Sequence, residues 1–172
     1  VPLKGLDFTL KAIALLKEDF PQVRLIVIGA PRLGGHTERL IQKLKIEANI
    51  VYKSNLTKEE IAIEYAQSNI AIVSSLYEGF GFPVGEAMAC GIPLIATNVA
   101  SIPEITNIFA ELIPARDSKS IELAIRNILS NPSKYQIRAD AGREHIIENF
   151  DWQKIAKSYE SLIFQTIEEF KC

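Results

Sequence analysis

The sequence predicts an α/β domain with a doubly wound, parallel β-sheet and a helical C-terminal tail, and two patterns support this prediction. Short apolar runs alternate with longer segments in which apolar residues recur at helical spacing, as in a parallel sheet whose connections are helices. The last third of the chain keeps helical spacing and carries several helix-start signals. This order is that of a Rossmann-like domain.

Five short runs are predicted as strands because each is aliphatic or β-branched and ends at polar or turn residues. Buried central strands of a parallel sheet have this composition, since helices cover both of their faces. The predicted strands are 24–28, 50–53, 70–74, 93–97 and 110–113.

Helices are predicted between and after these strands from apolar stripes and N-terminal signals. The first stripe contains Leu6, Leu10, Ile13 and Leu16. Capping residues then mark the later helices, because their side chains can bond to the exposed N–H groups of the first turn. These signals are Thr57 with Glu60, Asp117 or Ser118, Asn131 before Pro132, and Asp151 before Trp152.

Length and composition predict one soluble globular domain over 1–172. The net charge of −2 argues against a nucleic-acid partner, because such proteins normally carry a clustered excess of Lys and Arg. No apolar run reaches the roughly 18 residues that would span a bilayer. Cys90 and Cys172 have no disulfide or metal-site spacing, which favours a reducing, cytoplasmic compartment.

Ligands of such sheets bind beyond the carboxyl ends of the strands, where loops meet helix N-termini. After the third predicted strand the chain has three glycines in seven residues, which let the backbone approach a ligand and present N–H groups. These are Gly79, Gly81 and Gly85, and Pro83 suits the first turn of a helix that would favour a diphosphate.

Two carboxylates flank this loop, Glu78 before it and Glu86 in the predicted first turn of the helix, eight positions later. Carboxylates accept hydrogen bonds from paired hydroxyls, so the layout suits a ligand with hydroxyls at both ends and phosphates between them. The alternative is that Glu86 is a favourable helix-start charge and that Glu78 is a solvated loop residue.

The run from Glu78 through Gly-Phe-Gly to Glu86, followed by 91–98, resembles the Glu-x7-Glu motif of retaining GT-B glycosyltransferases of family four, also called group one. The resemblance extends from Lys4-Gly5 through Pro103-Glu104 to 150–152. It implies the C-terminal half of a GT-B fold, with the N-terminal acceptor domain and the first strand of this domain missing.

The resemblance also implies residue roles. Glu78 would hydrogen-bond the transferred sugar, and Glu86 would accept the ribose hydroxyls. Lys4 would contact the diphosphate together with an Arg that would precede Val1; without the resemblance Lys4 would be a solvated surface lysine. The catalytic candidates are thus Lys4 and Glu78. The donor-binding candidates are Gly29, Ala30, Asn55, Leu56, Glu78, Gly79, Phe80, Gly81, Phe82, Pro83 and Glu86.

Two other loops enter this set by their place. Gly29-Ala30 would occupy the family's Gly-x-Gly loop beside the nucleotide, although a flexible connection is the other interpretation. Pro31 and Arg32 interrupt any Gly-x-Gly-x-x-Gly fingerprint, so no nicotinamide cofactor is predicted. Asn55-Leu56 would meet the base through backbone contacts.

A few residues outside the predicted site also matter to the comparison with the family. Ala100-Ser101 depart slightly from it, because they stand where the family often has Gly-Gly, although both residues are still small. His36 and His145 are expected on the surface, and Cys90 as a small buried apolar residue. No metal-ligand spacing occurs, so a metal-independent reaction without a cofactor is predicted.

The implied function is retaining sugar transfer from a UDP-, GDP- or ADP-sugar to a carbohydrate or lipid-linked acceptor, in cell-surface polysaccharide or lipopolysaccharide synthesis. The full-length protein would be cytoplasmic, with peripheral association at the inner face of the membrane left open. A GT-B-like sugar-nucleotide epimerase, a phosphorylase and a non-catalytic nucleotide-sugar-binding module remain alternatives.

The last predicted helix carries an apolar stripe that must pack on something. In similar enzymes this helix crosses back to the N-terminal domain. In this chain part of the stripe is expected to be exposed, and the chain alone is expected to be inactive. The stripe contains Trp152, Ile155, Tyr159 and Leu162.

Overall fold

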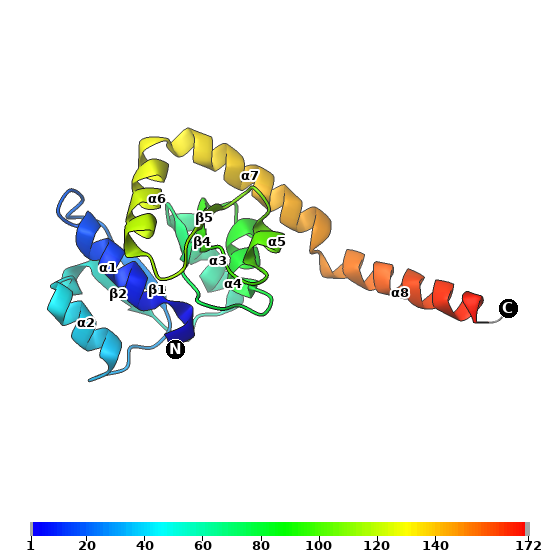
Figure 1. The fold of residues 1–172 in the computed structure, drawn as a ribbon, viewed down its shortest axis with the longest axis horizontal. Coiled ribbons are helices and arrows are strands. Elements are labelled where there is room, and N and C mark those ends of the chain that lie inside the picture. The colour runs from blue at the N-terminus through cyan, green and yellow to red at the C-terminus, as the bar shows by residue number, and fades with distance from the viewer. Residues whose placement is uncertain (1, 171–172) are drawn as a thin grey trace.

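The computed structural model describes residues 2–170 and confirms the predicted α/β class (Figure 1). All five predicted strands form, and each lies within one residue of its predicted bounds. Every strand pair is parallel. The strands are β1 (Leu25–Ile28), β2 (Ile50–Lys53), β3 (Ala71–Val73), β4 (Leu94–Thr97) and β5 (Glu111–Ile113).

The strands form two separate sheets, β1–β2 and β3–β4–β5. Leu25 pairs with Ile50 in the first sheet, and Ala71 pairs with Leu94 in the second. Among the described residues no strand lies on the second edge of β1 or of β3. The sheet is therefore interrupted between these two strands.

Helices connect and cover the strands. They are η1 (Pro2–Lys4), α1 (Leu6–Leu16), α2 (His36–Leu44), η2 (Glu47–Asn49), α3 (Lys58–Gln67), α4 (Phe82–Ala89), α5 (Ile102–Thr106), α6 (Ser118–Ser130), α7 (Pro132–Asn149) and α8 (Trp152–Glu169).

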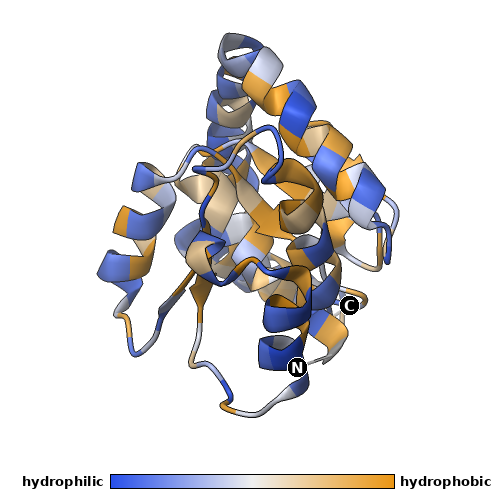
Figure 2. Cartoon of the chain, turned by 90° about the vertical axis from the view of Figure 1, so that its left-hand side faces the viewer, coloured by the Kyte–Doolittle hydropathy of each residue, from blue (hydrophilic) through white to orange (hydrophobic). Residues whose placement is uncertain are grey.

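Strand β4 shows how the two faces of the larger sheet are covered. Ile95 packs with buried residues of α1 and α6, whereas Leu94 and Ala96 on the other face pack with α4 and α7. Apolar residues gather on the strands, and the helices turn hydrophilic residues outward (Figure 2). Helices on both faces of a parallel sheet make the fold doubly wound, as predicted.

The predicted capping signals mostly act as expected. Thr57 and Glu60 form a complete capping box at α3. The carboxylates of Asp117 and Asp151 accept hydrogen bonds from the first-turn amides of α6 and α8. Asn131 holds the predicted place before Pro132, but its side chain donates to the Asn127 carbonyl instead of capping α7.

Helix α8 leaves the body of the molecule and extends away from it (Figure 1). None of its residues is buried, and Trp152 and Tyr159 of the predicted stripe are 73% and 65% exposed. No helix within residues 2–170 is both long and apolar enough to cross a membrane.

Candidate functional site

The Lys4-Gly5 pair lies far from the β3–α4 loop in the sequence, but the two backbones lie side by side in the structure. The Leu76 amide donates to the Leu3 carbonyl at 2.7 Å, and Ser74 Oγ donates to the Lys4 carbonyl at 3.1 Å. Gly5 has a φ of 65°, and a Cβ at this position would lie 1.8 Å from the Ser74 carbonyl oxygen. Only glycine fits here, so Gly5 lets α1 begin directly against the end of β3.

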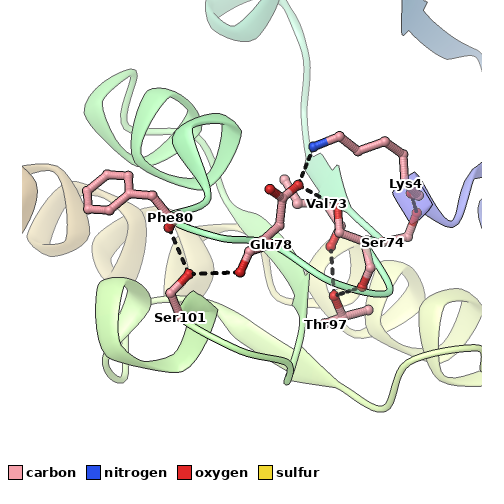
Figure 3. A network of polar contacts seen from close by, with 8 residues as sticks. Lys4, Val73, Ser74, Glu78, Phe80, Thr97 and Ser101 are labelled. Carbon is pink, nitrogen blue, oxygen red and sulfur yellow. Dashed lines mark hydrogen bonds and ion pairs between the residues drawn. The ribbon is translucent and has the colours of Figure 1, made fainter. Parts of the chain in front are cut away.

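Glu78 lies in the centre of this contact and is only 9% exposed. Its carboxylate accepts a hydrogen bond from Ser75 Oγ at 2.8 Å and forms an ion pair with the Lys4 ammonium group (Figure 3). The interpretation of Glu78 as a solvated loop residue is therefore wrong. A buried carboxylate needs such partners. Without them the buried negative charge would destabilise the folded state by roughly several kcal/mol.

Burial and pairing act on the Glu78 pKa in opposite directions. Burial raises the pKa of the carboxyl group, but the hydrogen bonds from Lys4 and Ser75 and the charge of Lys4 together lower it below its ordinary value. Glu78 is thus ionised at neutral pH. It is a fixed acceptor with one oxygen engaged by protein donors.

Hydrogen bonds from Ser and Thr hydroxyl groups hold the backbone around Glu78 in place. Thr97 Oγ1, at the end of β4, donates to the Ser75 carbonyl at 2.6 Å, and Ser101 Oγ donates to the Phe80 carbonyl at 2.9 Å (Figure 3). Thr9 Oγ1 donates to Ser74 Oγ at 2.9 Å. No such role was predicted for these hydroxyls. Ser74 and Thr97 end two predicted strands and Ser101 follows one of them, which is a signal for a site at the strand ends, but Thr9 has no such signal.

The loop ends where α4 begins. Gly81 precedes α4 with a φ of 89°, in the left-handed region that favours glycine, and Pro83 lies in the first turn as predicted. Phe80 and Phe82 stay largely exposed, with their ring centroids 5.0 Å apart.

Glu86 differs from its expected place. Because α4 begins at Phe82, Glu86 is the fifth residue of the helix and not part of its first turn, so the predicted position was wrong by one turn. Its side chain is exposed, and its carboxylate makes no hydrogen bond or ion pair with the residues the structure describes. Burial, followed by the nearby Glu86 and Cys90, raises the pKa of Tyr65 to about 12.

Cys90 follows α4 and is half-buried. Burial and the neighbouring Glu86 raise the pKa of its thiol, against a smaller lowering by Arg143. A raised pKa makes the thiol less reactive. The expected burial of Cys90 is met only in part, because the residue is half-buried. Cys172 lies outside the described residues.

The loop after β1 leads to α2, and the loops after β1 and β2 begin side by side. His36, at the start of α2, contacts Asp7 in the first turn of α1 at 2.6 Å, so the end of the loop after β1 lies beside the start of α1. The Gly29 amide donates to the Lys53 carbonyl at the end of β2 at 2.7 Å. Ala30 and Asn55 are exposed, Leu56 is half-buried, and Asn55 has a φ of 58°.

The two histidines have structural contacts. His36 is exposed, as expected, and joins α2 to α1. His145 is half-buried, so its expected surface placement was wrong: its Nε2 lies 3.2 Å from the Ile105 carbonyl, and its ring packs against Phe109 and Phe150. Within residues 2–170, no three or more His, Cys, Asp or Glu side chains are grouped to hold a metal ion.

The doubly wound sheet, the Gly-rich turn before α4 and the paired Lys4 and Glu78 define a class of domain, the C-terminal domain of GT-B glycosyltransferases. Sucrose-phosphate synthase from Thermosynechococcus elongatus superposes on this chain with a TM-score of 0.86 at 27% identity, covering 98% of this chain and 44% of that chain. Anabaena HepE, solved in complex with UDP-glucose, has the same fold, with a TM-score of 0.82 at 22% identity over 94% of this chain and 46% of its own.

The sequence comparisons define the family. The model for glycosyl transferases group 1 matches residues 1–145, and the chain belongs to this family. An MMP alpha-(1->4)-mannosyltransferase from Mycolicibacterium hassiacum is 34% identical over 159 residues, which are 91% of this chain and 38% of that protein. The chain thus spans about two fifths of the length of these relatives.

Proposed function

We propose that this chain is the donor-binding domain of a retaining glycosyltransferase that transfers a sugar from a nucleoside-diphosphate sugar to a hydroxyl acceptor. The observation that carries the proposal is the buried Glu78 carboxylate, held by Lys4 and Ser75 beside the Gly-rich turn that opens α4. An ionised, oriented acceptor at the carboxyl ends of parallel strands suits a ligand rich in hydroxyls.

Lys4 and Glu78 have complementary tasks in this proposal. The Lys4 ammonium group has three donors and is half-exposed, so it can keep its bond to Glu78 and also neutralise a phosphate oxygen. As the glycosidic bond breaks, negative charge grows on the departing diphosphate. Fixed cationic and N–H donors near that charge stabilise the transition state, and one such donor contributes about 3 kcal/mol.

The remaining candidates hold the rest of the donor. Glu86 is exposed and unpaired among the described residues, so its two oxygens are available to a pair of ribose hydroxyls. The amides of 79–81 face the sugar and phosphate, and Phe80, Phe82 and Pro83 line the approach. Gly29-Ala30 and Asn55-Leu56 contribute backbone groups to the nucleotide.

The relatives bear on the class of donor. HepE was solved with UDP-glucose, which supports a uridine donor, while the mannosyltransferase relative leaves the transferred sugar open. UDP-, GDP- and ADP-sugars are therefore all tested below. The reaction needs neither a metal ion nor a cofactor in this scheme, because Lys4 and backbone amides supply the charge stabilisation.

The whole protein completes the site. Among the described residues no strand pairs with the second edge of β1 or of β3, while Leu25 of β1 and Ile72 of β3 pack on the same apolar cluster beneath α1. One further parallel strand fits between them, entering just before η1. The acceptor, a carbohydrate or a lipid-linked sugar of cell-surface polysaccharide synthesis, would bind to an N-terminal domain that faces the loops, at the inner face of the membrane.

The test uses the full-length protein and a panel of UDP-, GDP- and ADP-sugars. Slow donor hydrolysis releases the nucleoside diphosphate without a known acceptor, and NMR identifies the first-formed anomer of the sugar. We expect release from one nucleotide class with retained configuration, and a loss of about 100-fold in Glu78→Gln, equal to roughly 2.7 kcal/mol. Glu104→Gln, an exposed carboxylate in α5, is the matched control.

Three outcomes would contradict the proposal. An inverted first product excludes retention. Full activity in Glu78→Gln excludes the assigned role of that carboxylate. Failure of the wild-type protein to bind any member of the panel at millimolar concentration favours a non-catalytic module.

A further inference from the structure

Ser101 has a hydroxyl group that does not perform its usual local task. It occupies the position before α5, where a serine normally accepts a hydrogen bond from the first helical turn. Its backbone is already helical, with φ −75° and ψ −11°, and its side chain makes no capping bond. The hydroxyl donates instead across to the Phe80 carbonyl at 2.9 Å, and the Glu78 carbonyl lies 3.4 Å away.

The two carbonyls near Ser101 belong to alternate peptide units of the β3–α4 loop. A trans peptide is planar, with its C=O and N–H directed oppositely. A carbonyl drawn toward Ser101 therefore turns the N–H of the next residue away from it. The Glu78 and Phe80 carbonyls are followed by the amides of Gly79 and Gly81, so both amides face the side opposite Ser101.

These two amides have no protein acceptor among the described residues. Gly81 is buried, and a buried N–H without a partner is uncommon in a folded protein. Neighbouring N–H groups aimed in one direction form an anion-binding concavity. The Ser101 bond thus sets the direction of the donors that the loop offers to a ligand.

The turn that presents Ser101 is strained. Ala100 has a φ of 47°, a left-handed conformation that costs a residue with a Cβ more than it costs glycine. Such a conformation persists where the surroundings impose it, and it is common at ligand sites.

We propose that Ser101 is a positioning residue: its hydroxyl fixes the Phe80 carbonyl and thereby aims the Gly79 and Gly81 amides at the phosphate next to the transferred sugar. This inference rests on the proposed donor site. Ser101 touches neither donor nor acceptor in this scheme and acts through the loop backbone.

The experiment compares Ser101→Ala and Ser101→Thr in the full-length protein, with Ser68→Ala as the matched control. Ser68 Oγ also donates to a backbone carbonyl, that of Glu64 at 2.8 Å, but at the far end of α3. For each variant the dissociation constants of the donor sugar nucleotide and of the nucleoside monophosphate with the same base are measured.

Ser101→Ala should weaken binding of the sugar nucleotide by up to about tenfold, the upper end for one lost neutral hydrogen bond, and leave binding of the monophosphate unchanged. Ser101→Thr restores the hydroxyl and should restore the affinity, while Ser68→Ala should alter neither. Equal weakening of both ligands, or no weakening of either, overturns the positioning role.

The amide NMR signals of Gly79 and Gly81 in the ligand-free protein give a second readout. They should move in Ser101→Ala and return close to their wild-type positions in Ser101→Thr. If they do not move, the positioning role is wrong even where a donor binds. If they move but the wild-type protein binds no donor, the proposed function fails and the loop contact stands.

Discussion

The β3–α4 loop and α8 reverse the usual distribution of polar and apolar side chains. In the loop the polar residues Ser75 and Glu78 are buried, and the Thr97 hydroxyl bonds to the loop from β4. In α8 the apolar residues Trp152 and Tyr159 are 73% and 65% exposed. Buried polar groups that have hydrogen-bond partners favour a single conformation. An exposed apolar stripe is typical of a surface that packs against another domain or protein.

The difference teaches where each region obtains its order. The loop is held by contacts from α1, β4 and the turn before α5, so the rest of the domain fixes it. Helix α8 keeps its own backbone bonds and an Asp151 cap but has no buried side chain. Substitutions in the loop should therefore affect the folding of this chain much more than changes in α8.

The largest expected effect is that of Gly5→Ala. The new Cβ would lie 1.8 Å from the Ser74 carbonyl, at a φ of 65°, so α1 must move away from β3. Together the strain and the lost packing should destabilise the fold by about 3 kcal/mol or more, measured by urea unfolding.

Gly85→Ala is the control for that substitution. Gly85 lies within α4, and an added Cβ meets no atom within 4 Å. Alanine should leave the unfolding free energy unchanged or raise it by up to about 1 kcal/mol, because it has the higher helix propensity. A Gly5→Ala protein as stable as Gly85→Ala would show that the close approach of α1 to β3 is wrong.

Glu78→Gln should have the next largest effect and lower the free energy of unfolding by about 1–2 kcal/mol at pH 7, because hydrogen bonds to a charged group are lost. The loss stays modest because Lys4 is half-exposed and solvent already screens its charge. The folded-state pKa of Glu78 is lowered, so its stabilisation is present above the unfolded-state value near 4.3 and disappears as pH falls through the folded-state pKa. Urea unfolding at pH 7, 5 and 3.5 should show the two proteins converging at low pH. A constant difference across this range would contradict the ion pair.

Ala100→Gly should give a smaller effect of the opposite sign. Glycine relieves the left-handed conformation at φ 47° but increases the entropy of the unfolded chain, so a gain of about 0.5 kcal/mol is expected. Thermal unfolding measures it. Lower stability in the glycine variant would show that Ala100 is not strained.

Removal of residues 151–172 should have the smallest effect on this chain, within about 0.5 kcal/mol, because α8 buries none of its side chains. Urea unfolding of the shortened and the original chain tests this expectation. A loss above about 1 kcal/mol would mean that α8 packs on the domain after all.

Features that depend on local sequence could be predicted from it. The five strands and the caps at Thr57, Asp117 and Asp151 follow from side-chain pattern within a few residues. The position of the Gly-rich loop after β3 could also be predicted, because it follows from the order of the strands.

Features that depend on tertiary contacts could not be predicted. Lys4 and Glu78 are 74 positions apart, and Ser101 bonds to Phe80 21 positions away. The side-chain pattern contains no signal for either pairing. The start of α4 at Phe82, which puts Glu86 one turn further along, depends on the left-handed Gly81. His145 is partly covered because α7 packs near α5.

The most direct test of the donor site measures nucleotide affinity in three proteins: the wild type, Glu86→Gln and Glu104→Gln. Both glutamates are exposed on helices that follow the strand ends, but only Glu86 is assigned to the ribose. We predict that one of UDP, GDP and ADP binds to the wild type. Glu86→Gln should weaken the affinity for that nucleotide about tenfold, or roughly 1.4 kcal/mol, whereas Glu104→Gln should bind it as the wild type does. Equal affinity in Glu86→Gln, or equal losses in both variants, would contradict the donor site described here.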